Sequence, residues 1–216
     1  MVESYVSSFD TSVYSRFTKK IIESLSKDQI VSFVSYGHPL YLVNTSQEII
    51  QYANANNVDL EVIAGISSLD LIWNIIGEDP GGRGMQVLEA AHMIEGNIQL
   101  VKEIDLYIAH ATEYKIPFER SEKVSDNPEG IKEIKKTLTS NGYKESYIVH
   151  FIACSPIPTL DDVVMSVSIS EMDSHECLLK YMRGMTLFVP NKECANNFEL
   201  KKLNKKTINK SLNSEA

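Results

Sequence analysis

The chain has 216 residues, of which 43% are apolar and 23% are charged, as in ordinary globular proteins. This length suits one large domain or two smaller ones. The net charge of −8 argues against a nucleic-acid binder, which normally presents a basic face. The three cysteines, Cys154, Cys177 and Cys194, form no CxxC pair, so the sequence predicts neither a zinc site nor a disulfide framework.

The N-terminal stretch "MVESYVSSFDTS" is polar and lacks the charged start and apolar core of a signal peptide. No apolar run approaches the roughly 20 residues that a membrane-spanning helix needs. We therefore expect a cytoplasmic protein in a reducing compartment, with no membrane partner.

Helices and strands alternate along the first half of the chain. Apolar spacing predicts a helix over residues 13–28, and apolar, β-branched runs predict buried strands at 29–36 and 58–65. Further helices are predicted at 45–57 and 67–77. The candidate helix caps are Asp10 or Ser12, Thr45 or Ser46, and Ser67 or Ser68. Strands separated by helices of this length imply parallel pairing in an α/β sheet.

A second set of elements follows the stretch "EDPGGRG" (78–84), which is read as a mobile turn. Strands are expected within 102–111, 145–158, 161–172 and 182–190, and an amphipathic helix over 128–143 should end at Asn141-Gly142. This organisation predicts an N-terminal α/β domain at 1–99, a C-terminal α/β domain at 100–192, and a polar, basic tail at 193–216.

Two glycine turns follow the two strands predicted in the first half. They are "YGHP" (36–39) and "AGISS" (64–68). Ligands of α/β sheets bind just beyond the carboxyl ends of strands, and glycine lets the backbone approach a ligand closely. The paired turns therefore predict a cofactor cradle, with an ordinary pair of turns as the alternative.

The order of these motifs resembles the tetrapyrrole methylase superfamily, over most of residues 10–192. Its generic turns correspond to Gly37-His38-Pro39 and to Ala64–Ser68, and a strand–"CSPIP" turn follows in the second domain. The resemblance implies two α/β domains of the tetrapyrrole methylase type, with a cleft between them that binds S-adenosylmethionine (SAM). S-adenosylhomocysteine would be the product of the cofactor, and a homodimer is the usual assembly.

One branch, the borosin-type peptide α-N-methyltransferases, is more similar still. It carries Tyr-Gly-His-Pro, and its "GISxxxxxxxxxGxDPxxxGxxxxEA" pattern resembles the stretch from Gly65 to Ala91. A late "TxxxP" strand resembles Thr186 to Pro190. The methylase-like domains fused to nucleotide pyrophosphohydrolases share the "GHP" turn and are the second branch considered.

Two features depart from the family pattern. Superfamily members normally begin with a strand and a Gly-rich loop that form part of the cofactor site, whereas this sequence starts near the helix that comes later. We therefore expect a truncated N-terminal domain, a misassigned start, or a partner that supplies the element. Borosin enzymes also carry an Arg four residues before the tyrosine of the catalytic helix, and Asp10 stands there.

The resemblance implies that Tyr36 and Tyr14 assist proton removal from a peptide amide, with packing roles as the alternative. It favours backbone contact by Ile108 or Ala109 over side-chain contact by His110. The residues implied in cofactor binding are Gly37, His38, Pro39, Leu40, Tyr41, Leu42, Ser67, Ser68, Ile108, Ala109, Ala153, Gly184, Met185 and Thr186.

The acceptor expected from this resemblance is a backbone amide on a separate peptide. The alternatives are a methyltransferase acting on a tetrapyrrole or another small molecule, and a non-catalytic binding protein that has lost its SAM loop. The sequence shows no cluster of carboxylates or histidines, which argues against a metal enzyme.

Overall fold

The computed structural model describes residues 11–25, 30–116, 123–155, 157, 160–191 and 208–209. Contacts divide the chain into two compact units, one ending at Asp70 and the other beginning at Leu71. The boundary predicted near residue 99 stays a prediction. The division by contacts lies earlier in the chain than residue 99. The strands before and after that residue, 85–89 and 105–109, pair in one sheet and so belong to the same unit.

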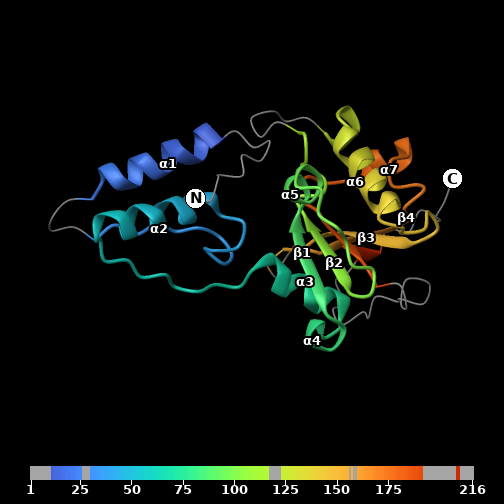
Figure 1. The fold of residues 1–216 in the computed structure, drawn as a ribbon, viewed down its shortest axis with the longest axis horizontal. Coiled ribbons are helices and arrows are strands. Elements are labelled where there is room, and N and C mark those ends of the chain that lie inside the picture. Colours follow the sequence, from blue (N-terminus) through green and yellow to red (C-terminus); the bar gives the residue numbers. More distant parts are fainter. Residues whose placement is uncertain are drawn as a thin grey trace. The chain divides into compact units, whose positions relative to one another are not determined.

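The first unit is built on two helices, α1 (Thr11–Glu23) and α2 (Asn44–Asn56) (Figure 1). The hydroxyls of Ser15 and Thr18 on α1 donate to the Glu48 carboxylate on α2. The predicted cap of α2 is wrong. Val43 occupies the N-cap without a side-chain hydrogen bond, and Thr45 and Ser46 are buried inside the first turn.

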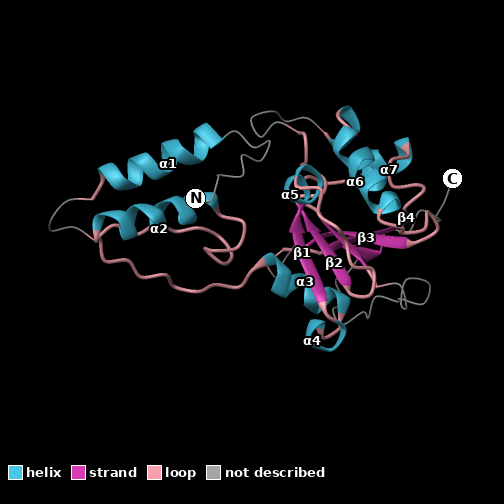
Figure 2. Ribbon diagram, viewed as in Figure 1, coloured by secondary structure: helices cyan, strands magenta, loops and turns pink. Residues whose placement is uncertain are grey.

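The two strands predicted in this unit, at 29–36 and 58–65, are absent from its described residues (Figure 2). A segment becomes a strand only when its N–H and C=O groups pair with a neighbouring strand, and residues 11–70 contain no described strand pair. Their apolar side chains lie in solvent instead: Val34 is 86% exposed and Ile63 78%. The β-branched composition of these runs favours strands, but no described segment of this unit pairs with them.

The described residues of the second unit form a six-stranded sheet in the order β1-β2-β5-β3-β4-β6. The strands are β1 (Met85–Glu89), β2 (Asp105–Ala109), β3 (Ile148–Ala153), β4 (Val163–Ser168), β5 (Thr186–Val189) and β6 (Ile208–Asn209). β1 and β2 pair in parallel around α5 (Ala90–Glu95), whereas β2, β5, β3 and β4 pair antiparallel in turn. The fold is therefore mixed α/β.

Helices cover both faces of this sheet. α6 (Glu129–Ser140) and α7 (His175–Lys180) lie on one side, while α3 (Ser68–Ile76) and the single turn α4 (Pro80–Arg83) lie on the other (Figure 1). A short 3-10 helix spans Val124–Asp126. α7 was missed in the sequence because one turn and a half carries too little periodicity to detect.

The predicted helix over 128–143 is confirmed as α6. Its buried residues Ile131, Ile134 and Leu138 repeat at helical spacing against the sheet. It ends in a Schellman motif, in which Gly142 has a φ of +80° and the Tyr143 amide donates to the Leu138 carbonyl.

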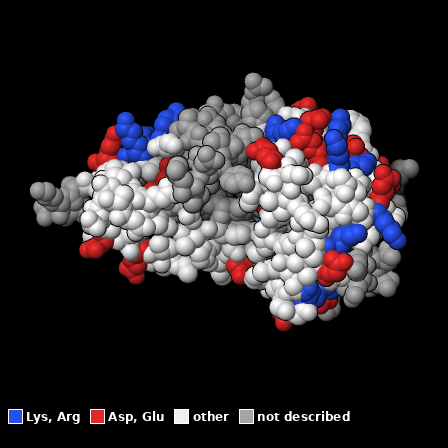
Figure 3. Space-filling view, in the orientation of Figure 1, with Lys and Arg blue, Asp and Glu red and all other residues white. Residues whose placement is uncertain are grey.

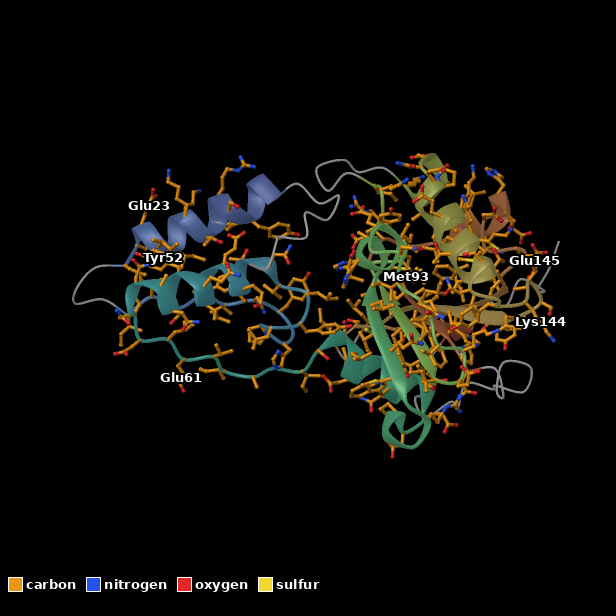
Figure 4. The ribbon with its side chains drawn as sticks, in the orientation of Figure 1. Glu23, Tyr52, Glu61, Met93, Lys144 and Glu145 are labelled. Atoms are coloured by element: carbon orange, nitrogen blue, oxygen red, sulfur yellow. The ribbon has the colours of Figure 1, made fainter. Side chains whose placement is uncertain are left out.

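The main core fills the space between these helices and the sheet. It includes Leu106, Phe151 and Leu187 from the strands and Met93 from α5, which is labelled in Figure 4. In Figure 3, basic and acidic side chains alternate over the second unit, whereas uncharged atoms make up most of the visible, described part of the first. None of the described helices has both the length and the apolar character to cross a bilayer.

Candidate cofactor site

The two glycine turns of the first unit lie against each other. A Cβ added to Gly65 would lie 2.4 Å from the carbonyl oxygen of Gly37, a separation that real Cβ atoms do not reach. Gly37 has a φ of +78°, which disfavours any other residue there. The backbone of the "AGISS" turn therefore touches that of the "YGHP" turn because Gly65 lacks a side chain, whereas Gly37 is required by its φ.

The "YGHP" turn is fixed by hydrogen bonds of His38. Its Nδ1 accepts from the Leu40 amide at 3.1 Å, and its carbonyl accepts from the Tyr41 amide at 3.1 Å. Leu42 has a left-handed φ of +60°, which reverses the chain into α2. His38 thus holds the turn in shape, while Leu40 and Leu42 keep apolar surface in solvent.

Ser67 caps the start of α3. Its hydroxyl accepts from the Asp70 amide at 3.3 Å, and the Asp70 carboxylate accepts from the Ser67 amide at 2.7 Å. Two hydrogen bonds lower the pKa of Asp70. The larger effect comes from the Ser67 hydroxyl and the smaller from the Ser67 backbone amide. The predicted cap is therefore confirmed for Ser67, and Ser68 is the first residue of the helix.

The two tyrosines predicted to act in catalysis occupy different positions in the first unit. Tyr36 precedes the Gly37 turn and is 94% exposed. Tyr14 lies half-buried on α1, where its carbonyl accepts from the Thr18 hydroxyl. The Asp10 position lies outside the described residues.

In the second unit, strand register gathers the remaining predicted residues at one end of the sheet. Ile108 pairs with Leu187, and Ile152 pairs with Thr186. Because β5 runs antiparallel to β2 and β3, its start meets their ends. Residues Ile108, Ala109, Ala153, Gly184, Met185 and Thr186 therefore lie at the same edge.

This edge is well packed. Ala109, Met185 and Thr186 are buried, while Gly184, with a φ of +79°, is exposed. Thr112 ties the edge together, because its hydroxyl donates to the Met182 carbonyl at 2.7 Å and accepts from the Met185 amide at 3.0 Å. No local pattern pointed to Thr112, because its partners lie some seventy residues away in the chain.

Two ionisable side chains lie at the same edge. Glu89 ends β1 and His110 follows β2, with Glu89 Oε1 3.7 Å from His110 Nδ1. The Glu89 carboxylate also accepts from the His92 amide at 3.0 Å and caps α5. Glu89 was not selected from the sequence, in which no strand was predicted to end at this position. Among the described residues, no three His, Cys, Asp or Glu side chains gather as metal ligands.

The sheet and its flanking helices define a tetrapyrrole methylase-like fold. The structure matches the uroporphyrin-III C-methyltransferase from Thermus thermophilus, solved with S-adenosyl homocysteine, with a TM-score of 0.56 and 12% identity, over 86% of this chain and 75% of that one. It matches the methyltransferase CobJ with a TM-score of 0.52 and 12% identity, over 83% and 70% of the two chains.

In sequence, the chain is similar to borosin methyltransferases. It is 24% identical, over 193 residues, to a methyltransferase and type II borosin cyclic peptide precursor of Phlebiopsis gigantea, covering 88% of this chain and 33% of that protein. A type I borosin counterpart from Cerrena unicolor is 21% identical over 182 residues, which cover 84% of this chain and 43% of that protein. The chain thus spans less than half the length of these relatives. No family model matches it.

These findings confirm the resemblance inferred from the motifs. The fold is of the tetrapyrrole methylase type, and the sequence similarity is to the borosin branch.

Proposed function

We propose that the protein is a SAM-dependent methyltransferase. The observation that carries this proposal is the register of β2, β3 and β5, which brings six residues expected at the cofactor to one sheet edge. In α/β sheets such edges, at the carboxyl ends of strands, are where ligands bind.

The backbone at both glycine turns suits a cofactor of this kind. Gly37 and Gly65 bring the two turns into backbone contact, and glycine at a turn also lets a ligand such as SAM approach the backbone closely. SAM supplies an activated methyl group when bound. The residues proposed to hold it are Gly37–Leu42 and Ser67-Ser68 in the first unit, with Ile108, Ala109, Ala153 and Gly184–Thr186 in the second.

We propose a backbone amide of a separate peptide as the methyl acceptor. Support comes from the similarity to two borosin methyltransferases, whose own chains include a peptide precursor. An amide is a weak nucleophile, so the protein must position it and assist its loss of a proton. Tyr36 and Tyr14 are the proposed assisting groups. The exposure of Tyr36 leaves it accessible to an incoming peptide.

Two measurements test this function. Calorimetry of the purified chain with SAM and with S-adenosylhomocysteine should give saturable binding of both. Incubation with SAM and a library of synthetic peptides should then give products heavier by one methyl group, located on the backbone by tandem mass spectrometry. The absence of any heat of binding at millimolar ligand would contradict the proposal and favour a non-catalytic binding protein.

The small-molecule alternative rests on the structural neighbours, which include a uroporphyrin-III C-methyltransferase. The double variant Tyr14→Phe/Tyr36→Phe separates the two. It should lower peptide methylation strongly while leaving cofactor binding intact. A chain that methylates uroporphyrin-III, with or without both hydroxyls, would instead support the alternative. Light scattering would test the proposed homodimer.

A further inference from the structure

The segment of residues 58–66, which leads from α2 into the "AGISS" turn, has the composition of a strand but no strand partner. Every residue in it is exposed, and Figure 1 shows it drawn out without a helical turn. Among the described residues, none donates a hydrogen bond to the backbone of residues 59–66 or accepts one from it. Such unpaired backbone groups are a template for a strand added from another polypeptide.

The side chains of this docking segment specify what the added strand should carry. In a strand, successive side chains point to opposite faces, so Val58, Leu60 and Val62 would share one face while Asp59 and Glu61 share the other, about 7 Å apart. Neither carboxylate has an ion-pair or hydrogen-bond partner among the described residues. Figure 4 shows Glu61 pointing away from α1 and α2. One face therefore favours apolar side chains and the other favours cations.

The docking segment ends where the proposed chemistry takes place. Gly65, near its end, lies against the backbone of Gly37, and Tyr36 comes directly before that glycine. Tyr36 is the exposed group proposed to assist proton removal from the acceptor amide. A peptide laid along residues 58–66 would therefore arrive at the contact between the two glycine turns.

We infer that the peptide substrate docks as an added strand along residues 58–66, and that the favoured peptides alternate basic and apolar side chains. This inference rests on the proposed function. Hydrogen bonds between the two backbones would hold a peptide of any sequence. Two basic side chains two positions apart in the peptide would match the spacing of Asp59 and Glu61, which gives the preference for cations.

Hydrogen exchange of the full chain, followed by mass spectrometry, locates the docked peptide. The probe is an acetylated and amidated octapeptide of alternating valine and lysine. One control carries glutamate in place of lysine, and another is the lysine peptide with every amide N-methylated. We expect the lysine peptide to slow exchange at residues 59–65 by about tenfold or more, and both controls to protect them much less. Unchanged exchange there at millimolar lysine peptide, or equal protection by either control, would overturn the inference.

The double variant Asp59→Asn/Glu61→Gln tests the two carboxylates. It should weaken binding of the lysine peptide by about three- to tenfold at low salt, and the difference should shrink as salt is added. The matched control is Glu145→Gln/Asp161→Asn, which removes the same charge at exposed positions of the second unit and should bind as the unchanged chain does. An equal loss in both variants would mean that net charge alone attracts the peptide, which would refute the docking segment.

Methylation kinetics separate this inference from the proposed function. With SAM present, the lysine peptide should be methylated with a lower KM than the glutamate peptide, and its KM should rise in Asp59→Asn/Glu61→Gln. Equal KM values for the two peptides would contradict the inference. If the unchanged chain binds no SAM, the proposed function fails instead, while the exchange result still judges the docking segment.

Discussion

Gly65 and Gly37 show how strongly a single residue can constrain the proposed cradle. Adding one methyl group at Gly65 would place a carbon 2.4 Å from a backbone carbonyl, which cannot rotate away as a side chain could. The two turns would have to separate, and with them the backbone groups proposed to contact the cofactor.

We therefore expect Gly65→Ala to lower affinity for S-adenosylhomocysteine by about tenfold or more and to destabilise the chain by about 1–3 kcal/mol. The matched control is Gly82→Ala, where an added Cβ meets nothing within 4 Å. Calorimetry and thermal melts of both variants check this. Equal affinities in the two variants would show that the contact between Gly65 and Gly37 is not needed for binding.

His150 gives a residue-scale prediction about pH. It is 3% exposed, its Nδ1 lies 2.8 Å from the Ser166 hydroxyl, and its ring stacks on Phe188. Burial disfavours the charged form and lowers its pKa from 6.5 to about 4. The unfolded chain then binds the proton more readily, so stability is complete above pH 6.5 and declines as the pH falls toward 4.

Replacing His150 with glutamine should remove this dependence, because an amide does not titrate while it can still hydrogen-bond Ser166. Denaturant melts at pH 4 and pH 7 would measure it, with the exposed His175→Gln as control. If the unchanged chain and His150→Gln lose the same free energy of unfolding between these pH values, other groups govern acid stability.

At the scale of elements, an ion pair between the partly exposed Arg83 and the buried Asp105 anchors α4 to the sheet. Arg83 donates twice to Asp105, with Nε–Oδ2 at 2.9 Å and Nη2–Oδ1 at 3.1 Å. The backbone amide of Asn191 also donates a hydrogen bond to Asp105 Oδ1 at 2.8 Å. The Asp105 carboxylate therefore joins the start of β2 to the residues that follow β5. The stretch "EDPGGRG", predicted as a mobile turn, is therefore fastened to the core.

Arg83→Ala should cost about 3–5 kcal/mol, since it leaves the buried Asp105 charge without its partner. Lys180→Ala offers the comparison, because the Lys180–Glu176 pair on α7 is exposed and should contribute less than about 1 kcal/mol. Denaturant unfolding of both variants measures this contrast. Similar costs would mean that Asp105 is satisfied without Arg83.

The same elements show what sequence patterns could and could not reveal. The periodicity of Ile131, Ile134 and Leu138 predicted α6 and its buried face, because that information is local. The pairing of Ile152 with Thr186 and the bonds of Thr112 depend on residues far apart in the chain. The strands predicted at 29–36 and 58–65 are absent for the same reason. Local composition indicates that a segment can form a strand, but the strand forms only when a neighbouring strand pairs with it.

At the scale of the whole molecule, protection from hydrogen exchange should differ between the two units. Amides in β2, β3 and β5 are paired within a buried sheet and should exchange slowly. Amides of residues 30–36 and 58–65, which lie in no described strand, should exchange quickly. Exchange followed by mass spectrometry measures both. Slow exchange at 30–36 would mean that this segment is paired in solution.

β6 has a consequence for how molecules of this protein meet one another. It pairs in parallel with β4 through Val163↔Ile208 and Val164↔Asn209, so the strand at that margin of the sheet is only two residues long. β6 covers two of the six residues of β4 and so shortens the part of β4 that could accept a strand from another molecule. A chain ending at Asn191 would expose the full length of β4, and we expect it to self-associate at concentrations where the whole chain does not.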